Sequence, residues 1–95
     1  GELLVKDRTL GAFSLHDNTS EAFIPLEGTA VLVVARKDDL SDQKSFLLDR
    51  PVIIEPSVWH GLYAPCGEVR MLILENSIVN MKKKTCMEGE CHDQS

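Results

Sequence analysis

The sequence predicts an all-β fold, a small antiparallel barrel or sandwich, and three observations lead to that prediction. Short runs of β-branched and other apolar residues recur at intervals of roughly 8–12 residues. Each run is bounded by Pro, Gly or charged residues, as is typical of strands joined by turns. No segment before Ile78 has the periodicity of an amphipathic helix. Many short strands at such spacing are typical of antiparallel barrels and sandwiches.

Four strands are expected in the first half of the chain. Residues 3–5 and 12–15 are short apolar runs, and residues 22–26 form a third run. Pro25 lacks a backbone N–H, so this third run is expected at a sheet edge, at a bulge or at a strand end. Residues 29–35 (TAVLVVA) make the strongest strand, because they are rich in β-branched residues and apolar on both faces.

Four more strands are expected in the second half. The charged segment RKDDLSDQK (36–44) is interpreted as a connection of hairpin type. The apolar runs that follow it cover residues 45–48, 52–54, 58–63 and 69–74. Together these segments predict one barrel domain over residues 1–78, followed by a polar C-terminal tail over residues 79–95.

Size and charge limit the function classes. The chain has 95 residues, which is enough for one domain. A domain this small buries only a modest share of its surface, so a homodimer is expected. The net charge of −5 argues against nucleic-acid binding, which needs a basic face. The longest apolar run, residues 30–35, is too short to span a bilayer, so no membrane partner is expected.

The cysteines favour a reducing compartment. Their count is three, and an odd number without a regular framework fits reduced thiols better than a secreted disulfide scaffold. No leader sequence is recognisable, so a cytoplasmic protein is expected. Cys66 lies in a turn and is interpreted as an incidental thiol. In the tail, a flexible acidic segment is favoured over a soft-metal site on Cys86, Cys91 and His92.

Two histidines and a glutamate are the main candidates for a site. His16 and Asn18 share strand parity, so both are expected on one face, with Glu21 shortly after them. His60 comes much later, in the run VWHGLY. If these strands meet inside a barrel, two imidazoles and a carboxylate converge, which is a donor set for a divalent ion. Such a pocket takes a small-molecule ligand, whereas the alternative is a structural His60 satisfied by a hydrogen bond.

Two stretches around these residues resemble the sequence motifs of the cupin family. Residues 11–28 resemble the first motif, G-x5-H-x-H-x3–4-E-x6-G, with Asn18 in the place of the second histidine. Residues 49–64 resemble the second motif, G-x5-P-x-G-x2-H-x3-N, with Ser57 in the glycine position. The resemblance extends over most of residues 11–75.

The resemblance to cupins implies both a fold and a metal centre. The implied fold is a small antiparallel double-stranded β-helix, the jelly-roll barrel of that family. The implied centre is a divalent ion (Zn, Mn, Fe or Ni) bound by His16, Glu21 and His60, which would also be the catalytic residues. Asn18 and Arg70 are the candidates for substrate binding, since the guanidinium of an arginine can clamp a carboxylate.

One branch of the family is especially similar. The segments EAFIPLEGTAVLVVA and SVWHGLYAP resemble parts of ureidoglycolate lyase sequences. This similarity implies a C–N lyase that releases urea from a small polar organic acid. A second similarity, in the progression F-L-L…P…I-x-P…W-H, is to sugar-nucleotide isomerases of cupin fold. A non-catalytic cupin that binds or senses a sugar or an organic acid is a further alternative, since the first motif has one histidine fewer.

The neighbours of His60 have structural interpretations. Trp59 and Tyr63 share parity and oppose His60, so they are expected to pack between sheets or in a dimer interface. Gly61 has no side chain and therefore leaves room for the close approach of another backbone or of a ligand.

Overall fold

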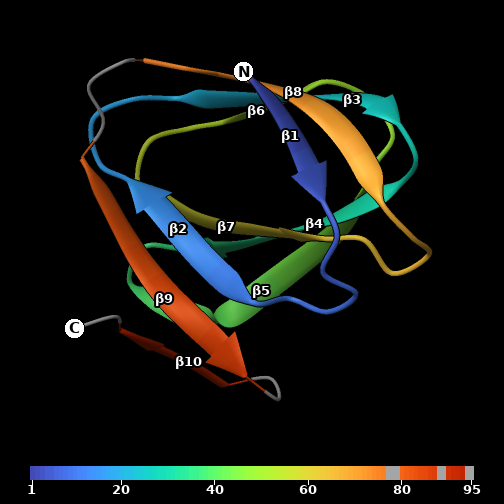
Figure 1. Cartoon of the computed structure of the whole chain (residues 1–95). Helices are drawn as coiled ribbons and strands as arrows, with labels where there is room; N and C mark the ends of the chain where they lie inside the picture. Colours follow the sequence, from blue (N-terminus) through green and yellow to red (C-terminus); the bar gives the residue numbers. More distant parts are fainter. Residues whose placement is uncertain (77–79, 88–89, 94–95) are drawn as a thin grey trace.

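The short apolar runs of the sequence pair in the structure into two antiparallel sheets (Figure 1). A computed structural model of the chain describes residues 1–76, 80–87 and 90–93, with the backbone alone for Met87 and residues 90–93. The strands are β1 (Glu2–Val5), β2 (Ala12–His16), β3 (Glu21–Glu27), β4 (Ala30–Arg36), β5 (Asp39–Leu48), β6 (Val52–Ile54), β7 (Val58–Tyr63), β8 (Val69–Glu75), β9 (Met81–Met87) and β10 (Glu90–Asp93). Within the described residues, no helical segment combines the length and the apolarity that crossing a bilayer requires.

The two sheets together enclose the main core. Their strand orders are β1-β8-β3-β6 in the four-stranded sheet and β10-β9-β2-β7-β4-β5 in the six-stranded sheet. Both sheets contribute to one cluster of buried side chains, which comprises Val5, Phe23, Ala30, Leu32, Leu48, Ile54, Ala64, Val69 and Met71. The prediction of an all-β fold with antiparallel sheets is therefore confirmed.

A second core lies on the other face of the six-stranded sheet. Successive residues of a strand point to opposite faces, so Leu32 of β4 joins the main core while Val31 and Val33 join the second one. This explains why residues 29–35 are apolar on both faces. Trp59 is buried here, and its Nε1–H donates to the carbonyl oxygen of Lys37 over 3.3 Å. The second core comprises Phe13, Leu15, Val31, Val33, Ala35, Trp59 and Cys86.

Strand β5 begins earlier than the sequence indicates. The turn after β4 consists of Lys37 and Asp38 alone, and β5 starts at Asp39. The connection is thus of hairpin type, as expected, but it is shorter than the charged segment 36–44, most of which is strand. β5 lies at the edge of its sheet, where polar and charged side chains on a strand are tolerated because they face water.

Met81–Met87 form a further strand, where the sequence favours a flexible tail. β9 pairs antiparallel with β2, with Ala12 opposite Thr85 and His16 opposite Met81 (Figure 1). The lysines of β9 have a low intrinsic preference for strands, which is why the sequence favours a tail here. Pairing with β2 and burial of Cys86 in the second core override that preference. The expected polar tail is thus corrected for Met81–Met87 and for β10, which extends the same sheet.

The thiols do not all have the state that the sequence favours. Cys86 is disulfide-bonded, whereas Cys66 is free and exposed. The backbone of Cys91 lies directly opposite Cys86 in the β9–β10 ladder. The expectation of reduced thiols is therefore wrong for Cys86, and the side chains in the proposed soft-metal alternative at Cys91 and His92 lie outside the described residues.

Alkylation is expected to separate the two kinds of cysteine. When the unfolded protein is treated with iodoacetamide without reductant, Cys66 should be modified and Cys86 should not. After reduction, both should be modified, because only a thiolate attacks the reagent. Peptide mass mapping of the two samples checks this, and complete modification of Cys86 before reduction would contradict the disulfide.

Candidate metal centre

Three buried side chains, two from one sheet and one from the other, converge in the space between the two sheets. His16 lies at the end of β2 and His60 lies in β7, on adjacent strands of the six-stranded sheet. Ser14 is opposite His60, and His16 is two residues further on, so both imidazoles project from the same face. Glu21, the first residue of β3, comes from the other sheet. One ligand atom from each of the three lies within 4.8 Å of the others, and the three residues are only 4–6% exposed.

The hydrogen bond of His60 determines which ring nitrogen carries a proton. Nδ1 lies 3.0 Å from the carbonyl oxygen of Val58, which can only accept, so Nδ1 carries a proton. Nε2 lies 3.2 Å from Oε1 of Glu21. A lone pair and a carboxylate oxygen repel at that distance, so either a proton or a cation lies between them. A histidine that donates its other N–H to a backbone carbonyl is the usual arrangement of a metal ligand.

His16 completes the group with a nitrogen that has no partner. Its Nδ1 is buried without a hydrogen bond and lies 3.7 Å from Oε2 of Glu21, too far for a hydrogen bond. The two imidazole rings meet edge to face, with centroids 5.1 Å apart. Burial lowers the pKa of His16, the charge of Glu21 opposes this, and His60 lowers it further. His16 is therefore neutral at pH 7, and its lone pair is available to a cation.

Glu21 supplies the negative charge of the group. Burial acts to raise its pKa, but the hydrogen bonds with His60 and Glu75 and the charges of both imidazoles act against burial, and the pKa is lowered. The carboxylate is consequently ionised at neutral pH. Two imidazoles and a carboxylate form a donor set for a divalent transition metal, and three protein ligands leave at least one coordination position for an exogenous ligand.

Glu75 is a fourth member of the group that the sequence does not reveal. It is the last residue of β8 and lies directly opposite Glu21 in the β3–β8 ladder. Its hydrogen bond with Glu21 raises its pKa to about 7, with burial and the charge of Glu21 adding to the shift. Glu75 is exposed, so it places a second carboxyl group where the site meets solvent. The only signal in the sequence is a glutamate at the end of an apolar run, and its partner follows from the strand register alone.

Replacing Glu75 by glutamine is expected to change how stability depends on pH in metal-free protein. In the unfolded chain this carboxyl group ionises near 4.5, whereas in the folded chain it keeps its proton up to about 7. The folded state therefore binds more protons in this window, so this group makes the free energy of unfolding fall as pH rises through it. Above about pH 7 both states are ionised and the contribution is constant.

Relative to the wild type, the free energy of unfolding of Glu75→Gln should accordingly be higher at pH 8 than at pH 4.5. Urea denaturation in EDTA measures it. Glu27→Gln is the control, because Glu27 lies in the same sheet and its partner Arg70 is near the opposite end of β8 from Glu75. An equal difference at both pH values would show that Glu75 keeps no extra proton.

Two other residues expected at the site lie elsewhere. β2 ends at His16, so the parity argument does not extend to Asn18, which is exposed and accepts a hydrogen bond from the backbone N–H of Asn80 over 3.0 Å. Arg70 is also exposed and pairs with Glu2 at 3.2 Å and with Glu27 at 3.5 Å. The structure therefore does not bring Asn18 and Arg70 into the group formed by the other candidates.

The turn before β7 connects the two histidine strands. Ser57 has a positive φ of 65°, a region that a residue with a side chain enters at a cost. Its N–H donates to the carbonyl oxygen of His16 over 2.7 Å. The turn thus ties the end of β2 to the start of β7, and this holds His16 and His60 in their relative positions.

Gly61 brings the same two strands close together. A Cβ atom at this position would lie 2.4 Å from the carbonyl oxygen of Ala12 and 2.5 Å from Cδ1 of Leu10. The neighbour for which the sequence leaves room is therefore a backbone. The geometry of the centre depends on this contact, because β2 and β7 carry the two imidazoles.

A comparison of the chain with models of known protein families finds no match, and a comparison with curated proteins finds none either.

Proposed function

We propose that this protein is a metal-dependent domain of cupin type, which binds a divalent ion through His16, Glu21 and His60 and acts as a C–N lyase on an organic acid. The convergence of three buried ligand atoms within 4.8 Å carries the proposal. Two details support the fit of a cation: Nδ1 of His16 has no partner, and the carbonyl of Val58 directs Nε2 of His60 toward Glu21. Zn, Mn, Fe and Ni all accept such ligands.

The backbone at Ser57 supports the resemblance to cupins. Ser57 stands where the second cupin motif has glycine, and its φ is positive, as glycine would allow without strain. The candidate ligands also project between two antiparallel sheets, an arrangement compatible with the double-stranded β-helix of that family. These observations are independent of the sequence motifs themselves, since they concern conformation and placement.

The residues around the centre suit lyase chemistry. A divalent ion bound there supplies Lewis-acid polarisation of the substrate's oxygen atoms. Glu75, at the solvent side of Glu21, is the group placed to exchange a proton with a substrate hydroxyl. When that hydroxyl proton leaves and the C–N bond breaks, a carbonyl group forms, and a proton must reach the departing nitrogen. For a ureidoglycolate-type substrate, the products are an oxo acid and urea.

A non-catalytic binding or sensing domain is the second candidate. It is favoured by the burial of all three ligand side chains, because a substrate has to approach a metal that is almost closed off. A buried ion of this kind stabilises a small fold whether or not it turns over a substrate.

Metal content and turnover together test the proposal. Protein purified without chelator and without a nickel column is expected to contain one divalent ion per chain and to release glyoxylate from ureidoglycolate or a substituted analogue. Both properties should disappear in His60→Ala. Metal without turnover of any analogue would support the binding domain instead. No stoichiometric metal after incubation with Zn, Mn, Fe and Ni would overturn both forms of the proposal.

A further inference from the structure

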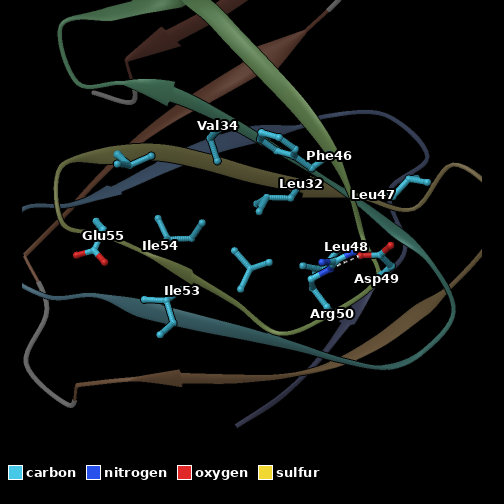
Figure 2. Close-up of a pocket in the computed structure, with 12 residues that line it drawn as sticks. Leu32, Val34, Phe46, Leu47, Leu48, Asp49, Arg50, Ile53, Ile54 and Glu55 are labelled. Atoms are coloured by element: carbon cyan, nitrogen blue, oxygen red, sulfur yellow. Dashed lines mark hydrogen bonds and ion pairs between the residues drawn. The ribbon is translucent and has the colours of Figure 1, made fainter.

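The structure contains an apolar cavity of about 640 Å³ (Figure 2). It lies between β5 and β6, each of which is an edge strand of its sheet. Its walls are mainly aliphatic, from Leu32, Val34, Ile54 and Val58, with Phe46 at its rim. A volume of several hundred cubic ångströms and an apolar lining are typical of sites for small molecules.

Three wall residues are immediate neighbours of the metal ligands. Val34 lies directly opposite His60 in the β4–β7 ladder, and Ile54 lies directly opposite Glu21 in the β3–β6 ladder. Residues paired in this way project on the same side of the sheet, with Cβ atoms about 5 Å apart. The carbonyl oxygen of Val58 accepts the hydrogen bond from Nδ1 of His60. The inner wall of the cavity is thus the layer of side chains that adjoins the centre.

The few charged residues of the cavity lie at its ends. Glu55 lies near one end, whereas Asp49 and Arg50 lie at the other and pair with each other at 3.1 Å (Figure 2). Between them the walls are apolar, so the hydroxyl groups of a sugar would lose hydrogen bonds to water without replacement. An alkyl or aryl group would instead gain free energy from burial. A divalent ion with one carboxylate ligand keeps a net positive charge and favours an anionic group.

We infer that the ligand of this protein is an organic acid with an apolar body, whose carboxylate is directed to the metal centre and whose alkyl or aryl part fills the cavity. The placement of the ligand's carboxylate at the metal centre rests on the proposed function. Among organic acids, the apolar walls of the cavity favour those that carry a substantial alkyl or aryl group.

Straight-chain carboxylates from butanoate to decanoate test the inference by calorimetric titration of zinc-loaded protein. The dissociation constant is expected to fall about fourfold per added methylene until the cavity is filled. EDTA-treated protein should keep this dependence on chain length but bind each acid at least about tenfold more weakly, because the partner of the carboxylate is removed. The corresponding alcohols should bind similarly with and without zinc.

Two variants of matched exposure locate the binding. Phe46 (53% exposed) lines the cavity and Leu74 (51% exposed) does not. Phe46→Ser is expected to weaken octanoate binding about tenfold, whereas Leu74→Ser should leave it unchanged, and both should bind zinc as the wild type does.

Failure of the inference and failure of the proposed function give different results. Zinc binding with no effect of chain length overturns the inference and leaves the proposed function intact. An effect of chain length in protein that binds no divalent ion supports the apolar cavity site and overturns the metal-dependent function. A dimer in sedimentation that Phe46→Ser dissociates, together with no binding of any acid, assigns the cavity to a second copy of the chain and overturns the inference.

Discussion

Substitution of Glu21 by glutamine is expected to reduce the affinity for divalent metal by more than about 100-fold, because loss of an outer-shell partner alone typically costs 10–100-fold. Glu21 links the two histidines, since its Oε2 lies 3.7 Å from Nδ1 of His16 and its Oε1 lies 3.2 Å from Nε2 of His60. Its lowered pKa means that it provides a full negative charge at neutral pH. Glutamine keeps the shape of the side chain but brings a neutral, weaker donor. The remaining pair of imidazoles would then hold a cation without charge neutralisation.

Isothermal titration with zinc, together with elemental analysis, measures this effect. Glu27→Gln is the matched control, because it makes the same chemical change on the same strand at an exposed position. Circular dichroism of both variants shows whether the fold is retained. Zinc affinity within about threefold of the wild type in a folded Glu21→Gln protein would exclude Glu21 as a ligand and with it the proposed centre.

The second large effect is expected from alanine at Gly61, which should destabilise the protein by on the order of 3 kcal/mol. The added Cβ would overlap the carbonyl oxygen of Ala12 at 2.4 Å, and a backbone atom within a paired strand cannot move aside as a flexible side chain can. β2 and β7 must therefore separate. The stability of a small domain is only about 5–15 kcal/mol, so a change of this size is a large fraction of the total.

Urea denaturation of Gly61→Ala and of Gly11→Ala tests this expectation. At Gly11 the nearest atom to a new Cβ is Oδ2 of Asp7 at 3.5 Å, which is ordinary contact, so that variant should be close to the wild type. Because β2 and β7 carry His16 and His60, Gly61→Ala should also weaken zinc binding in the fraction that stays folded. Equal stability of the two variants would mean that β2 and β7 do not approach as described.

The three ligand candidates show how far reasoning from residue spacing reaches. His16, Glu21 and His60 were predicted to converge, and the structure brings them together between the sheets. Asn18 was predicted from strand parity, but parity holds only as long as the strand continues, and β2 ends at His16. Glu75 was not predicted, because its place beside Glu21 depends on a pairing between strands that are far apart in the chain.

Eight of the strands follow from local features of the sequence alone. Turn residues and apolar runs are properties of a few neighbouring residues, so they can be identified without the fold. β9 lacks such a signal, since its polar residues form a strand only when β2 offers a partner. Cys86, which is disulfide-bonded, also lies in β9, so its state has no local signal in the sequence either.

The chain itself therefore specifies an antiparallel β protein with two imidazoles and a carboxylate available for one site, because alternation, turn chemistry and donor type are encoded residue by residue. Only the folded molecule decides that Glu75 lies beside Glu21, that Arg70 faces away, and that an apolar cavity adjoins the centre. The physical reason is that strand register and the facing of two sheets depend on the packing of the whole core, in which residues distant in sequence become direct neighbours.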